Sequence, residues 1–170
     1  MKIILIALLT IGPLHAQTTQ NHGHEEKSSA KRKELIENEK KVVLEVLQKN
    51  DDLFNAFLKK DAKAIAKAAT LLKDLISKSD VKALAEAKKK VDGLLKINAS
   101  NTQEKNLASY EAFNNLLLDV VKTYDVGSKF NIFNCPMVKK SWIQNVDTNK
   151  DIRNVYAMEM LECGSQETHF

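Results

Sequence analysis

Apolar residues recur every three or four positions between residues 31 and 124, with charged residues between them, and this spacing predicts amphipathic helices. Four apolar faces can be followed: Ile36, Val43, Leu47, Phe54 and Leu58; Ile65, Ala69, Leu72 and Ile76; Val81, Leu84, Val91 and Leu94; Leu107, Tyr110, Phe113, Leu117, Val121 and Tyr124. Asp61 and Asp80 precede the second and third runs, where a side-chain oxygen commonly caps a helix. Ser100 or Asn101 can cap the fourth. Because the connections are short, we expect an antiparallel up-and-down bundle of about four helices.

The pattern changes after Gly127, which is expected to end the fourth helix. The apolar residues within 130–133 predict a short strand or extended segment, and Pro136 disfavours a helix through the preceding residue. Polar residues crowd positions 145–151 and predict a turn, after which a last apolar group occupies 155–161. The sequence therefore predicts a small, irregular, short-strand cap on the helices.

The N-terminal segment is not expected to belong to the folded domain. A lysine and a short apolar run precede Ala16, so residues 1–16 are expected to be a secretory signal peptide cleaved near that alanine. Residues 17–30 are polar and are expected to form a flexible leader. The remainder, 31–170, is expected to be a single mainly α-helical domain whose cap covers 127–170. Because of the signal peptide, we expect a periplasmic or otherwise exported protein. No later segment is apolar enough to span a membrane, so we do not expect the mature protein to be membrane-spanning.

The distribution of charge argues against nucleic-acid binding. The chain has 26 lysines and arginines against 22 aspartates and glutamates, a formal net charge of +4, and the two signs alternate along the predicted helices. A nucleic-acid footprint gathers basic residues on one face, so none is expected. A catalytic nucleophile needs a base held beside it, and no histidine lies between residues 25 and 168. We therefore expect no enzymatic activity.

Both cysteines of the chain, Cys135 and Cys163, lie in the predicted cap. An exported protein with an even number of cysteines is expected to oxidise them. In the chain-entropy model a Cys135–Cys163 disulfide would stabilise the fold by roughly 3.5 kcal/mol. Such a bond would suit a segment that contributes few core residues of its own.

The same part of the chain can also form a soft-metal site. Cys135 and Met137 are two positions apart, which places both side chains on one side of an extended backbone. Met160 and Cys163 are three apart, which suits one face of a helical turn, and Met158 is a further candidate. Thiolates and thioethers are soft ligands that select Cu(I) over Mg²⁺ or Ca²⁺. Each methionine could instead fill a gap in the core, so the disulfide and the metal site remain alternatives.

Several short motifs of the cap carry a resemblance to a known family. They are Cys135-Pro136-Met137, Ser141-Trp142-Ile143, Asp151-Ile152-Arg153-Asn154, Tyr156, and Met160-Leu161-Glu162-Cys163-Gly164. With these motifs the chain resembles the domain of unknown function 3347 family. That family is an exported bacterial domain, found alone and fused to the membrane-fusion adaptors of copper and silver efflux pumps. Val155 departs from the family pattern, which has proline there.

The resemblance implies a copper-handling or metal-efflux context. We therefore expect an accessory protein that binds Cu(I) for sequestration or for transfer to an efflux adaptor. Its ligands would be Cys135, Met137, Met160 and Cys163, and Trp142 would shield the site or pack beneath it. The alternative is a non-enzymatic structural or protein-interaction module of the cell envelope, stapled by a disulfide between the two cysteines.

Overall fold

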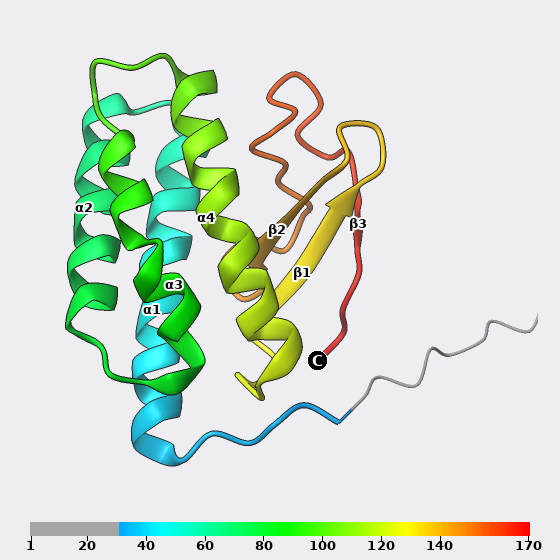
Figure 1. The fold of residues 1–170 in the computed structure, drawn as a ribbon. Coiled ribbons are helices and arrows are strands. Elements are labelled where there is room, and N and C mark those ends of the chain that lie inside the picture. The colour runs from blue at the N-terminus through cyan, green and yellow to red at the C-terminus, as the bar shows by residue number, and fades with distance from the viewer. Residues whose placement is uncertain (1–30) are drawn as a thin grey trace, which may run out of the picture. The chain divides into compact units, whose positions relative to one another are not determined.

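Three long helices make up most of the helical part of the structure. The computed structural model describes residues 31–170, so the expected signal peptide and polar leader lie outside the described residues. The long helices are α1 (Glu37–Leu58), α2 (Ala62–Lys78) and α4 (Gln103–Thr123). Figure 1 shows them side by side with their axes roughly aligned. The prediction of a mainly α-helical protein is confirmed.

The predicted continuous third helix is wrong. Its residues form two short 3₁₀-helices around one α-helix: η1 (Lys82–Leu84), α3 (Ala85–Lys89) and η2 (Val91–Lys96). The residues that face the core here are Val81, Leu84, Ala87, Val91, Leu94 and Ile97, which follow one another at steps of three with a single step of four. A 3₁₀-helix has three residues per turn, so overwinding keeps these side chains on one face. The helical part is therefore three long helices and one segmented helix.

The helix caps agree with the sequence at one of the three expected places. The Asp61 carboxylate accepts two backbone N–H groups at the start of α2, both at 3.0 Å. At α4 the cap is Thr102, which directly follows the expected Ser100 and Asn101. The short η1 has no side-chain cap among the described residues, and Asp80 pairs instead with a lysine of α3.

The C-terminal cap contains a three-stranded antiparallel sheet of order β2-β1-β3. The strands are β1 (Phe130–Cys135), β2 (Lys140–Asn145) and β3 (Ser165–Gln166). The extended segment expected at 130–133 is thus the first part of β1. Figure 1 places the sheet beside α4, and the turn between β1 and β2 lies at the same end of the cap as the coil before β3.

The sheet and the helices share one hydrophobic core. Its largest fully buried side chains include Phe54 and Phe57 from α1, Tyr110 from α4, Phe130 from β1 and Trp142 from β2. The cap is therefore packed onto the helices as part of the same unit. Within residues 31–170, no helix combines the length and apolarity needed to cross a membrane.

Candidate functional site in the C-terminal cap

The two cysteines are joined in a disulfide bond. Cys135 is the last residue of β1, and Cys163 lies two positions before β3, which pairs with β1 through Asn134 and Ser165. This pairing holds the two Cα atoms 5.9 Å apart, a separation typical of disulfides. Of the two alternatives left open by the sequence, the structure has the disulfide. Such bonds persist in oxidising compartments outside the cytosol, which fits an exported protein.

Hydrogen bonds hold the segment before Cys163 in consecutive turns. The N–H of Met160 donates to the carbonyl of Ala157 at 2.7 Å, and the N–H of Cys163 donates to the carbonyl of Met160 at 2.9 Å. The buried Asn154 closes the segment from the other side. Its N–H donates to the carbonyl of Leu161 at 2.7 Å, and its side-chain Nδ2 donates to the carbonyl of Cys163 at 2.9 Å. The single turn expected between Met160 and Cys163 is therefore present.

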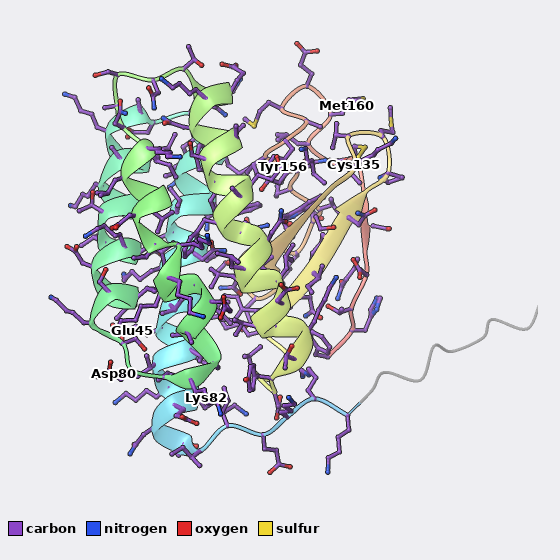
Figure 2. The ribbon with its side chains drawn as sticks, viewed as in Figure 1. Glu45, Asp80, Lys82, Cys135, Tyr156 and Met160 are labelled. Carbon is purple, nitrogen blue, oxygen red and sulfur yellow. A yellow bond between two sulfur atoms is a disulfide. The ribbon has the colours of Figure 1, made fainter. Side chains whose placement is uncertain are left out.

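Two of the three methionine side chains in the cap are exposed. Met137 is 69 % exposed and Met160 is 47 % exposed, whereas Met158 is half-buried. Cys135 is fully buried, so it does not share a face with Met137: β1 ends at Cys135, and Met137 lies in the following turn. Because Met137 and Met160 are exposed, neither of them fills a gap in the core. Figure 2 shows Cys135 and Met160 at the end of the cap where the β1–β2 turn lies.

Trp142 packs beneath the segment that carries Cys163. Its ring is fully buried and stacks on Phe133, with ring centroids 5.9 Å apart. Gly164, directly after the cysteine, lies against the ring, because a Cβ built on Gly164 would be 2.9 Å from Cη2 of Trp142. The same Cβ would be 2.8 Å from the carbonyl oxygen of Asn134. This packing places Trp142 next to the residue that follows Cys163, and its expected role of shielding a metal site stays a prediction.

Gln144, which is not among the predicted site residues, organises the coil between β2 and Cys163. Its Oε1 accepts from Nε1 of Trp142 at 3.2 Å and from the N–H of Arg153 at 3.0 Å. Its Nε2 donates to the carbonyls of Asn149 and Asp151 at 2.9 and 2.8 Å. One fully buried amide thus satisfies four partners and fixes the path of the coil. A glutamine directly after an apolar Trp–Ile pair in a strand is a signal for such a role.

A second feature, a buried polar cluster, lies between the helices and the cap. It contains Asn50 and Asp51 from α1, Tyr110 and Asn114 from α4, and Tyr156 from the cap. Each has at least one buried polar atom without a hydrogen-bond partner among the described residues. Burial raises the pKa of Asp51 and also the pKa of the Tyr110 and Tyr156 hydroxyl groups, which favours the neutral forms.

The sequence carries a signal for this cluster. Asn50 lies three residues after Leu47 and four before Phe54, so it stands on the apolar face of its helix. Asn114 lies four residues after Tyr110, also on an apolar face. Polar residues at core positions of a helical stripe indicate a buried polar network.

The described residues contain no group of three or more histidine, cysteine, aspartate or glutamate side chains that could hold a metal ion. A metal site in the cap would therefore depend on methionine sulfur as well as on the cysteines. Thioether and thiolate donors together would restrict such a site to a soft ion.

Comparisons of this chain with family models, with curated proteins and with solved structures find no match. The family resemblance therefore depends on the short motifs of the cap alone.

Proposed function

We propose that this chain is an exported, non-enzymatic accessory domain that binds Cu(I) in its C-terminal cap. It sequesters the ion or passes it to a heavy-metal efflux adaptor. The ligands are the sulfur atoms of Cys135 and Cys163 in their reduced form, together with Met137 and Met160. The observation that carries the proposal is the placement of two adjacent cysteines in a cap that also exposes two thioethers.

Copper binding requires the reduced cysteines. A dithiol reductant of the envelope supplies two electrons and two protons, so that the Cys135–Cys163 bond breaks, two thiols form and the reductant becomes a disulfide. Each thiol then loses its proton to bind the metal, because the thiolate is the ligand. Cys163 is half-buried whereas Cys135 is fully buried, so we expect an attacking thiolate to approach the bond from the Cys163 side. The oxidised protein, in which both sulfur atoms are in the disulfide, therefore does not bind copper.

The surface beside Met160 offers an approach for a cation. Met158, Glu159 and Met160 line a surface pocket of about 360 Å³ together with Arg153, Leu161 and Glu162. Glu159 and Glu162 outnumber the one cationic side chain, Arg153, so the lining carries a formal charge of about −1, and a locally negative surface attracts a cation. The close approach of Gly164 to the buried ring of Trp142 limits how far the backbone of this segment can move when the disulfide opens.

The test is a Cu(I) competition titration on the reduced protein and on three variants. The double variant Cys135→Ser/Cys163→Ser is expected to lose high-affinity binding. The double variant Met137→Leu/Met160→Leu keeps the thiolates and is expected to bind at least about tenfold more weakly, since one lost ligand interaction of about 1.4 kcal/mol has that effect. Leu71→Ala, at an exposed apolar position of α2 outside the cap, is the control and is expected to bind within about twofold of the wild type. Unchanged affinity in the cysteine variant would end the proposal.

A second candidate function is favoured by the disulfide itself. An envelope structural or protein-interaction module would keep Cys135 and Cys163 permanently oxidised, and the complete burial of Cys135 suits a structural bond. Mass spectrometry of protein taken from the exporting cell without reductant separates the two. A fully oxidised population that takes up no copper even after reduction supports the interaction module.

Export and periplasmic location are part of the same proposal. They are supported by the signal-like N-terminal sequence and by the disulfide. The intact mass of protein recovered from the envelope is expected to begin at Gln17, after cleavage near Ala16. Recovery of the uncleaved chain from the cytosol would contradict this location.

A further inference from the structure

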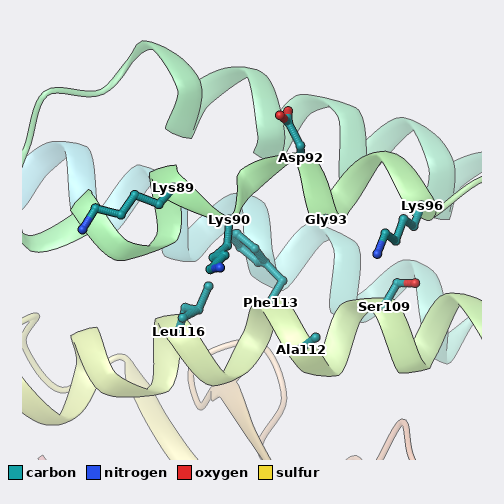
Figure 3. A pocket seen from close by; sticks show the side chains of 9 residues that line it. All are labelled: Lys89, Lys90, Asp92, Gly93, Lys96, Ser109, Ala112, Phe113 and Leu116. Atoms are coloured by element: carbon teal, nitrogen blue, oxygen red, sulfur yellow. The ribbon is translucent and has the colours of Figure 1, made fainter.

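A second candidate binding site lies between η2 and α4, in the helical part of the molecule. A pocket of about 530 Å³ opens there, lined by residues of both helices and of the end of α3. Figure 3 shows this pocket from close by. Its volume falls within the range of roughly 300–1,000 Å³ that is typical of small-molecule sites. None of its residues belongs to the cap or to the proposed copper site.

The floor of the pocket is apolar. Phe113 is almost fully buried and forms the base, with Ala112 and the half-buried Leu116 from the same helix beside it. Gly93 forms part of the opposite wall, and a Cβ built there would meet no described atom within 4 Å. Glycine at this position is required neither by a positive φ nor by a close contact, and it leaves the wall open.

The rim of the pocket is basic. Lys89, Lys90 and Lys96 line it, and Ser109 adds a hydroxyl group. Lys89 is paired with Glu86 at 2.5 Å, whereas Lys90 and Lys96 have no acidic partner within residues 31–170. Figure 3 shows the carboxylate of Asp92 pointing away from α4 and the amino group of Lys96 pointing toward it. The pocket therefore combines an apolar floor with a net positive edge.

We propose that this pocket binds a single-chain amphiphile with an anionic head, specifically a free long-chain carboxylate. The acyl chain lies on Phe113 and Leu116, and the carboxylate pairs with Lys90 or Lys96. A second, separate hollow of about 200 Å³ shares Leu116 with this pocket, and its lining along α4 includes Asp119 and Thr123. Along α4 the pocket of about 530 Å³ is lined from Ser109 to Leu116, a length of about 10 Å at 1.5 Å per residue, which accommodates part of an extended acyl chain.

Charge complementarity selects this ligand over its relatives. A neutral hydrocarbon would leave the lysines without a partner, and a cationic amphiphile would place like charges together. The pocket is a single hollow between η2 and α4. One acyl chain fits in it, whereas a lipid with two chains would leave one chain in water. The inference is independent of copper binding, because the two sites share no residue.

The test is isothermal titration calorimetry of the full chain with dodecanoate, below the concentration at which this soap forms micelles. Dodecyltrimethylammonium is the charge-reversed control ligand, and vesicles of phosphatidylglycerol are the control for membrane binding. We expect saturable one-to-one binding of dodecanoate and at least about tenfold weaker binding of the cation. Binding to the vesicles with no uptake of monomeric dodecanoate would overturn the proposal, as would equal binding of the two amphiphiles.

Two variants test the two halves of the site. The double variant Lys90→Gln/Lys96→Gln is expected to weaken dodecanoate binding about tenfold, and Lys67→Gln, on the exposed surface of α2, is the charge control and is expected to leave it unchanged. Gly93→Leu places a side chain in the pocket at a position with space for a Cβ, so the fold is retained and binding is lost. Gly93→Ala is its small control. Binding that survives both Gly93→Leu and the double lysine variant would overturn the assignment.

Discussion

Replacing Gly164 with alanine tests the geometry on which the cap depends. The backbone of Gly164 has φ 141°, a conformation that side chains rarely adopt. Alanine there also brings a Cβ to 2.8 Å from the carbonyl oxygen of Asn134 and 2.9 Å from the ring of Trp142. Both partners are held, the first in β1 and the second between Phe133 and Gln144. Neither can move away without disturbing the sheet.

The expected loss of stability can be worked out from these two effects. Backbone strain at a glycine-only conformation costs about 1–3 kcal/mol, and overpacking a filled site costs about 1–3 kcal/mol more. We therefore expect Gly164→Ala to lower the free energy of unfolding by about 4 kcal/mol. Two other glycines separate the effects. Gly127 has φ 77° but open space, so alanine there is expected to cost about 1 kcal/mol. Gly93 has neither constraint, so alanine there is expected to be neutral or stabilising by up to about 1 kcal/mol.

The assay is urea unfolding of the oxidised protein, followed by the fluorescence of Trp142, the single tryptophan of the chain. Because Trp142 contacts the substituted residue, circular dichroism of the helices serves as an independent probe. If Gly164→Ala is no more destabilising than Gly127→Ala, the close approach of the Cys163 segment to Trp142 is wrong.

Three further predictions concern other parts of the structure. The disulfide closes a loop with a sequence separation of 28, so its reduction, or the variant Cys135→Ser/Cys163→Ser, is expected to lower the free energy of unfolding by roughly 3.5 kcal/mol. Urea unfolding with and without reductant measures this change. A change below about 1 kcal/mol contradicts a stabilising bond. Gln144→Ala is expected to cost about 3 kcal/mol or more, because Nε1 of Trp142 and the N–H of Arg153 lose their acceptor; Gln166→Ala on the half-exposed β3 is the control and is expected to cost much less. Burial raises the pKa of Asp51 in the folded state. The contribution of Asp51 to the free energy of unfolding is therefore most favourable below the ordinary carboxyl pKa of about 3.9, and it is lost as pH rises through the pKa of the folded state. Urea unfolding measured at a series of pH values is expected to show this loss of stability in the wild type and not in Asp51→Asn.

The long helices could be predicted from the sequence because each one buries a single regular stripe. Their periodicity places Val43, Leu47 and Phe54 of α1 on the buried face, and the structure buries all three. The segment 82–96 could not be predicted with the same rule. Its apolar spacing of about three allows a 3₁₀-helix as well as an α-helix, and packing against α2 and α4 selects the tighter form in two of its three parts.

The cap was predicted less completely because its order comes from long-range contacts. The sequence identified the sulfur-bearing residues and left the disulfide and the metal site as alternatives. It could not place Cys135 beside Cys163, because that depends on β3, a strand of two residues with no periodic signal. The exposure of Met137 likewise follows from the turn that ends β1 and not from the residue itself. The role of Asn154 depends on the path of the coil that it closes, and the sequence alone does not give that path.

The measurement that tests the central claim most directly is a Cu(I) competition titration of the same preparation before and after reduction of the disulfide. The account predicts no copper uptake by the oxidised protein and one Cu(I) per chain for the reduced protein. Uptake that is absent from the reduced protein, or equal in both forms, would contradict copper binding by Cys135 and Cys163.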